Sequence, residues 1–170
     1  MGMKQLVILY STRTGNTKKL AQGLARELEE FEPVVMERKA GEAVPQAQAY
    51  LAGYWADRGH ANEEMEIFLK SLKNVKVGLF GTLGAYPYGP HARHIAQAAE
   101  DCLGEGCVLL GHFLCQGPVD PALLQRMSAG KPPTPETRRR HAIAATHPNE
   151  ADIRYAAALF RERLQAEFLD

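Results

Sequence analysis

The chain has 170 residues, 45% of them hydrophobic and 24% charged, and its 20 Lys and Arg residues balance its 20 Asp and Glu residues. This length and composition are typical of a globular protein, so we expect residues 1–170 to form a single domain. The lack of net charge argues against nucleic acid as a partner, and the lack of an apolar run of about 18 residues argues against a membrane span. The first residues lack the long apolar region of a signal peptide, and the three cysteines form no Cys-x-x-Cys pair. We therefore expect a cytoplasmic protein with reduced thiols.

Short apolar runs alternate with helical patterns along the chain. Four of the helical patterns carry an apolar stripe, such as Leu20, Leu24 and Leu28 in the first one. Strands are predicted at Lys4–Tyr10, Pro33–Glu37, Ala49–Trp55, Val75–Phe80 and Cys107–Phe113. Helices are predicted at Asn16–Phe31 and Glu63–Leu72, from Pro90, from Pro121 to Met127, from Pro135 to Thr146, and after Asn149. The stretch from Gly130 to Pro135 is the only one that resembles a linker.

This alternation predicts an α/β fold with a doubly wound, five-stranded parallel sheet that has helices on both faces. Connections between parallel strands are right-handed, and ligands of such sheets bind beyond the carboxyl ends of the strands, where the strand order reverses. The loops after the first, third and fourth strands would meet at that edge.

The first of these loops, Tyr10-Ser-Thr-Arg-Thr-Gly-Asn-Thr17, carries a hydroxyl on five of its eight residues. A turn of this kind before a helix presents backbone N–H groups and the positive end of the helix dipole to an anion. The loop lacks the Gly-Lys-Ser/Thr of a nucleoside triphosphate loop and the Gly-x-Gly-x-x-Gly of a dinucleotide site. It therefore favours a phosphate monoester, and the alternative is a capped turn without a ligand.

The second and third loops offer aromatic and glycine residues. Trp55, the only tryptophan, ends the third strand and either covers a flat ligand or packs into a local core. Asp57 and Arg58 form a solvated pair or belong to a turn. The third loop, from Gly81 to Gly89, contains three glycines that allow a ligand to approach the backbone, and the alternative is a tight turn with exposed tyrosines.

The pattern Thr12-x-Thr14-Gly15-x-Thr17 resembles the signature with which flavodoxins hold the phosphate of FMN. The resemblance implies a flavodoxin-like sheet with the strand order 2-1-3-4-5, of which flavodoxin is itself a standard example. The whole chain further resembles a branch of flavodoxin-like domains from anaerobic bacteria, some of which are associated with bilirubin reductases. The segments that carry this second resemblance are Tyr10-Ser-Thr-Arg-Thr-Gly-Asn-Thr-Lys-Lys-Leu20, Gly53-Tyr-Trp-Ala-Asp-Arg-Gly59, Leu79-Phe-Gly-Thr-Leu-Gly-Ala-Tyr-Pro87, Gly111-His-Phe-Leu-Cys-Gln-Gly117 and His147-Pro-Asn149.

The resemblance implies FMN as the cofactor and three groups of residues that bind it. The first loop would take the phosphate, the second loop would place Trp55 against the isoalloxazine ring, and the third loop would frame the pyrimidine side of that ring. The residues implied are Ser11, Thr12, Arg13, Thr14, Gly15, Asn16 and Thr17 in the first loop, Tyr54, Trp55 and Ala56 in the second, and Thr82, Leu83, Gly84, Ala85 and Tyr86 in the third.

Two features depart from the flavodoxin pattern. Flavodoxins are usually acidic, whereas this chain is neutral and carries His91-x-Arg93-His94 and Arg138-Arg-Arg-His141. These segments form either a basic partner surface or two solvated helix faces. Flavodoxins also often place glycine after the tryptophan, where a peptide flips to bond the one-electron-reduced flavin. Ala56 stands there in this chain, and a positive φ costs a non-glycine residue about 1–2 kcal/mol, so one-electron reduction should be less favoured.

Three functions remain open from the sequence. The first is an FMN-binding electron-transfer protein that serves a redox partner, such as a reductase or a flavin enzyme, with a tetrapyrrole reductase as one candidate. The second is an FMN-dependent NAD(P)H or quinone reductase with two-electron chemistry, and the third is a cofactor-free interaction domain. Cys115 either approaches the flavin or is a small buried hydrophobic residue. The spacing of the six histidines predicts no metal site, and no catalytic residue is assigned.

Overall fold

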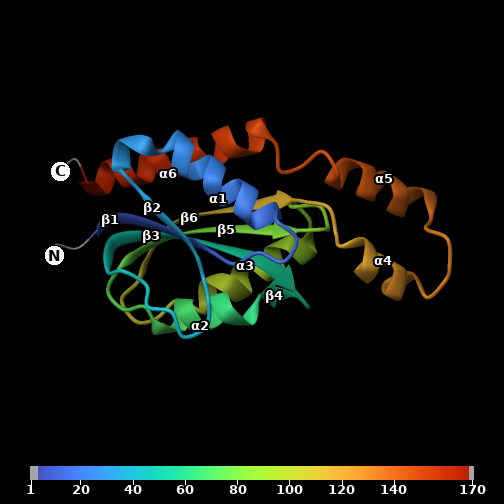
Figure 1. Cartoon of the computed structure of the whole chain (residues 1–170), viewed down its shortest axis with the longest axis horizontal. Helices are drawn as coiled ribbons and strands as arrows, with labels where there is room; N and C mark the ends of the chain where they lie inside the picture. Colours follow the sequence, from blue (N-terminus) through green and yellow to red (C-terminus); the bar gives the residue numbers. More distant parts are fainter. Residues whose placement is uncertain (1–3, 169–170) are drawn as a thin grey trace.

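Five parallel strands form the centre of the computed structural model, which describes residues 4–168 (Figure 1). The expectation about the start of the chain concerns residues 1–3, which lie outside this range. The sheet order is β2-β1-β3-β5-β6, which is 2-1-3-4-5 when only the parallel strands are counted, so the predicted doubly wound fold is confirmed. These strands are β1 (Lys4–Tyr10), β2 (Val34–Glu37), β3 (Ala47–Asp57), β5 (Lys76–Leu83) and β6 (Val108–Gln116).

Helices cover both faces of the sheet (Figure 1). One face carries α1 (Asn16–Glu27) and α6 (Glu150–Phe168), and the other carries α2 (Glu63–Ser71) and α3 (Pro90–Asp101). Each face has its own cluster of buried hydrophobic residues, because side chains alternate between the two faces of a strand. Among residues 4–168, no helix is both long enough and apolar enough to cross a membrane.

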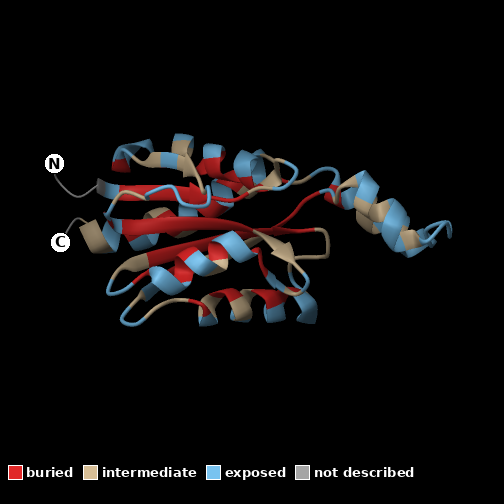
Figure 2. Ribbon diagram, turned by 60° about the horizontal axis from the view of Figure 1, so that its bottom comes forward, coloured by how far each residue is buried: buried red, intermediate tan, exposed pale blue. Residues whose placement is uncertain are grey.

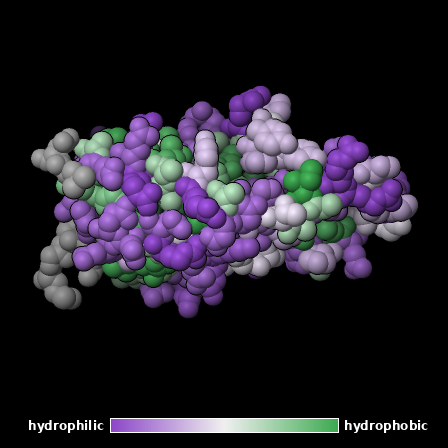
Figure 3. Space-filling model, turned by 90° about the horizontal axis from the view of Figure 1, so that it is seen from above, coloured by the Kyte–Doolittle hydropathy of each residue, from purple (hydrophilic) through white to green (hydrophobic). Residues whose placement is uncertain are grey.

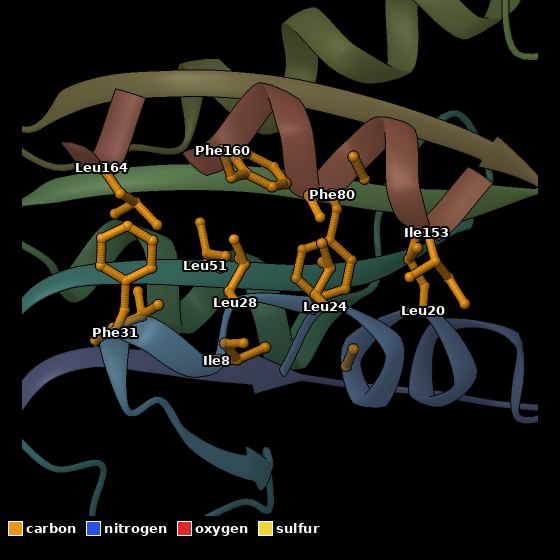
Figure 4. Packing of buried hydrophobic residues seen from close by; sticks show 14 of the residues in the cluster. Ile8, Leu20, Leu24, Leu28, Phe31, Leu51, Phe80, Ile153, Phe160 and Leu164 are labelled. Carbon is orange, nitrogen blue, oxygen red and sulfur yellow. The ribbon is translucent and has the colours of Figure 1, made fainter. Parts of the chain in front are cut away.

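The core between α1, α6 and the sheet is closely packed. Figure 4 shows Phe160 of α6 and Phe80 of β5 between the two helices and the strands. Gly23 of α1 allows the helices to approach, because a Cβ atom at this position would lie 2.5 Å from Cδ1 of Ile153. This packing holds the start of α1 against the sheet, which is where the predicted phosphate loop ends.

The elements differ from the sequence prediction mainly at their carboxyl ends. The predicted helix Asn16–Phe31 divides into α1 and a short 3-10 helix, η1 (Glu29–Phe31). The weakly predicted strand Ala49–Trp55 is the longest strand, because its end pairs with an unpredicted strand, β4 (His60–Ala61). The predictions for β5 and β6 ended three residues too early, since both strands continue to the edge where the candidate site lies.

Residues 118–147, between β6 and α6, form an arm that projects beyond the carboxyl edge of the sheet (Figure 1). The arm contains α4 (Pro121–Ser128) and α5 (Pro135–Ala144), whose amino ends are capped by the side chains of Asp120 and Thr134. No residue of α4 is buried, and Ala144 alone is buried in α5. Figure 2 shows the contrast between this exposed arm and the buried strands. Local capping therefore forms these helices with little help from a core.

Candidate functional site

A cavity of about 870 Å³ lies at the carboxyl ends of the strands, between the first loop and the arm. This volume falls within the range of small-molecule sites. The cavity is lined by all three loops that the sequence predicts to meet there. The lining includes Thr12, Arg13, Thr14, Asn16 and Thr17 from the first loop, Trp55, Ala56, Asp57 and Arg58 from the second, and Thr82, Leu83, Gly84 and Ala85 from the third.

The first loop is a tight turn that opens α1. Oγ1 of Thr12 accepts a hydrogen bond of 3.0 Å from the backbone N–H of Gly15. Gly15 has a φ of 99°, a left-handed conformation that favours glycine, and no side chain caps the helix at this position. The first turn of α1 contains no acidic residue. The backbone donors and the positive end of the helix dipole are therefore available to an anion in the cavity.

Several of the predicted phosphate residues already have side-chain partners within the chain, among them Asn16, whose amide donates to the carbonyl of Pro118. The hydroxyl of Ser11 is buried and accepts a hydrogen bond of 2.9 Å from Nδ2 of Asn62, and Ser11 does not line the cavity. The hydroxyl of Thr17 lies 2.8 Å from that of Thr82, so it joins the first loop to the third. Thr14 is exposed at the cavity and makes no side-chain hydrogen bond in the described structure. Thr14 is thus the hydroxyl most available to a ligand.

The second loop is a β-hairpin. Ala56 pairs with Ala61 and Asp57 pairs with His60, and the turn between them contains Arg58 at φ 53° and Gly59 at φ 89°. Two consecutive positive φ angles define the type I′ turn that is typical of two-residue hairpins. The turn interpretation of Arg58 is therefore confirmed, and Ala56 lies in a ladder of paired strands.

Trp55 is half-buried and lines the cavity at the start of this hairpin. The guanidinium of Arg13 lies 5.6 Å from the centre of its ring, and the same guanidinium lies 4.0 Å from a carboxylate oxygen of Asp120. Arg13 thus connects the tryptophan with the base of the arm through a cation–π contact and an ion pair.

Two tyrosines on the predicted list point away from the cavity. Tyr54 precedes Trp55 in β3, so its side chain faces the opposite side of the sheet, where it is fully buried. Its backbone carbonyl remains near the site, 3.5 Å from the hydroxyl of Thr17. Tyr86 stacks on Tyr88 with ring centres 5.6 Å apart, and its hydroxyl donates to Glu136 of the arm. Gly15 and Tyr86 are absent from the residues that line the cavity.

The arm supplies a further wall that the sequence did not predict. Gln116 fastens the third loop to the arm, because its side-chain amide donates to the carbonyl oxygens of Gly84 and Arg140. The position of Gln116-Gly117 at the carboxyl end of β6, and so at the same edge, was the available signal for this wall. The arm contributes Pro118, Val119, Asp120, Leu123, Leu124, Arg126, Met127, Arg140 and His141 to the lining. His91 of α3 and Gly117, just before the arm, also line the cavity.

The model of the Flavodoxin domain family matches residues 7–161 of this chain. The chain belongs to the flavodoxin family. It is 30% identical over 174 residues to the flavodoxin-like domain-containing protein BilS of Clostridioides difficile (strain CD3), a match that covers 95% of this chain and 96% of BilS.

Solved structures share this flavodoxin fold at low sequence identity. The flavodoxin of Streptococcus pneumoniae TIGR4 is 16% identical, with a TM-score of 0.59 over 96% of this chain and 99% of that protein. The flavoprotein of Lactobacillus acidophilus NCFM, solved in complex with FMN, is also 16% identical, with a TM-score of 0.50 over 74% of this chain and 99% of that one.

On the face of the sheet that carries α3, the chain contains a partly buried polar network that the sequence did not reveal. Nε2 of His112 accepts a hydrogen bond of 2.6 Å from the hydroxyl of Tyr54, and Nδ1 donates one of 2.9 Å to Glu100. Burial raises the pKa of Tyr54, which keeps the phenol protonated and able to donate. Burial also lowers the pKa of His112, although Glu100 opposes this shift, so the neutral imidazole fits between a donor and an acceptor.

We predict that His112 makes stability depend on pH. Because its pKa in the folded chain is lowered, the unfolded chain binds more protons as the pH falls below about 6.5, and the free energy of unfolding decreases. His112→Gln removes this titration and should make the decrease smaller. Denaturant unfolding at pH values above and below 6.5 measures this decrease in the free energy of unfolding.

His94→Gln serves as the control, because His94 is exposed on α3. This variant should keep the pH dependence of the unmodified protein. A His112→Gln variant that loses as much stability in acid as the unmodified protein would contradict a buried neutral imidazole.

Proposed function

We propose that this chain is an FMN-binding electron-transfer protein that serves a redox partner. The observation that carries the proposal is the first loop: Gly15 in the left-handed conformation starts an uncapped α1, and the exposed Thr14 lines a cavity that Trp55 also lines. Bound FMN would supply the capacity to accept and release one or two electrons.

The donors of the first loop fit the phosphate of FMN. Backbone N–H groups at the start of α1 and the hydroxyl of Thr14 would hold it, and Thr12 keeps the turn closed by its bond to Gly15. Gly117 supports this arrangement from the arm side, since a Cβ atom there would lie 2.6 Å from Nδ2 of Asn16. The absence of a lysine from the loop favours a monoester over a nucleoside triphosphate.

The ring of the flavin would lie against Trp55, between the hairpin and the loop from Thr82 to Ala85. The half-buried indole offers a flat apolar face, and the backbone of the third loop offers polar groups at the edge of the cavity. An intact loop and a cavity of about 870 Å³ speak against the cofactor-free interaction domain.

The hairpin bears on the choice between electron carrier and two-electron reductase. Ala56 is paired with Ala61, and the N–H of Asn62 donates to the carbonyl of Trp55 at 3.1 Å. A peptide flip next to Trp55 would therefore disturb paired backbone as well as place a non-glycine residue at an unfavourable φ. This observation keeps the NAD(P)H or quinone reductase as the second candidate.

The positive charge of the arm favours a partner that has an acidic surface. Residues 118–147 contain five Lys and Arg residues and two acidic ones, a net charge of +3 in a chain that is neutral overall. Its exposed large hydrophobic residues are Met127 and Ile143. Figure 3 shows hydrophobic residues on the mainly hydrophilic face, at the half of the molecule that carries the arm. A reductase or flavin enzyme, with a tetrapyrrole reductase as one class, would dock here beside the cofactor. The three free cysteines suit a cytoplasmic setting.

The first test is the affinity for FMN. Thr14→Ala removes a hydroxyl that would bond a charged phosphate, so FMN should bind about 10- to 100-fold more weakly. Fluorescence quenching of added FMN measures this affinity. Ser71→Ala, which removes a hydroxyl bonded to Phe68 at the opposite end of the sheet, is the matched control and should bind FMN normally. No measurable affinity in the unmodified protein would exclude both the carrier and the reductase.

The second test separates the carrier from the reductase. Ala56→Gly lowers the cost of a positive φ at this position by about 1–2 kcal/mol. The one-electron-reduced state should therefore become more stable, so the potential of the first reduction should rise relative to that of the second. Stepwise reduction of the FMN-loaded protein measures both potentials. Well-separated potentials in the unmodified protein support the carrier. Unresolved potentials together with turnover of NAD(P)H or a quinone support the reductase.

The third test addresses the arm. Arg138→Gln combined with Arg139→Gln removes two exposed charges outside the cavity, so electron transfer to a haem protein with an acidic surface should become several-fold slower at low salt. Stopped-flow mixing of the reduced protein with that acceptor measures the rate. The difference should disappear at high salt, and with a basic haem protein as acceptor it should change sign, because the substitutions then remove repulsion.

Arg154→Gln combined with Arg163→Gln makes the same charge change on exposed residues of α6. Equal slowing by the two double variants would show that net charge, and not the arm, controls the encounter.

A further inference from the structure

A thiol, an imidazole and a carboxylate meet where the arm joins the body of the protein. Cys115 lies near the end of β6, His147 precedes α6, and Asp152 lies in the first turn of α6. One potential ligand atom from each residue lies within 4.8 Å of the other two. The sequence did not predict this group, because the whole arm separates Cys115 from His147.

Hydrogen bonds already orient the three side chains. Nδ1 of His147 donates to Oδ2 of Asp152 at 2.6 Å, and the N–H of Asn149 donates to the same oxygen at 2.8 Å. The side chain of Asn149 accepts in turn from the N–H of Asp152, so Asp152 belongs to the cap of α6. Cys115 is 2% exposed, and its thiol donates to the carbonyl of Gln116. The group is thus arranged in advance of any ligand.

We propose that Cys115, His147 and Asp152 form a site for a Zn²⁺ ion, with one coordination position left open. Sulfur, imidazole nitrogen and carboxylate oxygen are the three ligand types that zinc takes in proteins, and the thiol and imidazole disfavour Mg²⁺ and Ca²⁺. The thiolate and the carboxylate together carry two negative charges, which neutralise a divalent ion in a partly buried position.

Binding would displace protons and leave the cap in place. Burial and the neighbouring carboxylate of Asp152 raise the pKa of Cys115, so the thiol carries a proton until the metal displaces it to solvent. The hydrogen on Nδ1 of His147 would move to Nε2, which frees Nδ1 for the ion. Asp152 has two oxygens, so one can bind the metal while the other keeps the N–H of Asn149.

The site would connect the two ends of the arm. Cys115 stands just before the arm begins and His147 is its last residue, so a shared ion would join the end of β6 to the start of α6. This inference does not rest on the proposed FMN function.

The test uses the whole protein, freed of metal by a chelator under reducing conditions and titrated with Co²⁺ as a spectroscopic substitute for Zn²⁺. One Co²⁺ per chain should bind and give the near-ultraviolet charge-transfer band of a thiolate ligand, and Zn²⁺ should displace it. Binding should weaken as the pH falls, because the thiol must lose its proton. The absence of a thiolate band in the unmodified protein would overturn the proposal without any variant.

Variants identify the ligands. Cys115→Ser should abolish the band, and His147→Gln and Asp152→Asn should weaken Zn²⁺ binding by about tenfold or more. Cys102→Ser is the matched control, since Cys102 is also buried but lies in the cluster on the other face of the sheet. A band that survives Cys115→Ser, or that Cys102→Ser removes, would overturn the proposal. Circular dichroism of each variant verifies that the fold is kept.

Discussion

The position of β1 between β2 and β3 is the constraint on which the site depends. The chain leaves β1 through α1 on one face of the sheet, reaches β2 at the edge, and then returns to β3, from which α2 continues on the opposite face. The loops after β1 and β3 therefore turn in opposite directions and leave a crevice between them. The cavity lies in this crevice, so its position follows from the strand order, and its walls come from whichever loops end there.

Local pattern was enough to predict most of the body of the fold. The bounds of β1 and the first residue of α1 agree with the prediction, because a buried parallel strand and an amphipathic helix leave clear periodic signals. β3 was only weakly predicted, since its alanine and glycine residues have low strand propensity and its pairing with two neighbouring strands compensates for them. The hairpin with β4 was missed because its turn depends on Arg58, an unusual residue for a positive φ.

Predicting which residues lie near the site was easier than predicting where their side chains point. Ser11, Tyr54 and Tyr86 all belong to the predicted loops, yet their side chains bond Asn62, His112 and Glu136, which are distant in the sequence. For Tyr54 the alternation of a strand was an available signal, because only one of two consecutive residues can face the cavity. For Ser11 and Tyr86, the direction of the side chain depends on contacts with residues distant in the sequence, which a local pattern does not contain.

The two halves of the cavity differ in how firmly they are held. The first loop and the third loop rest on a packed core and are joined by the buried contact between Thr17 and Thr82. The wall formed by the arm is held to the body mainly at its base, through Gln116 and through Asn16, which donates to the carbonyl of Pro118. Segments with few buried contacts open at a lower free energy than the core. The first loop, which suits a phosphate, is therefore the stable side of the cavity. The arm, which a partner would contact, is the side that can change its conformation on binding.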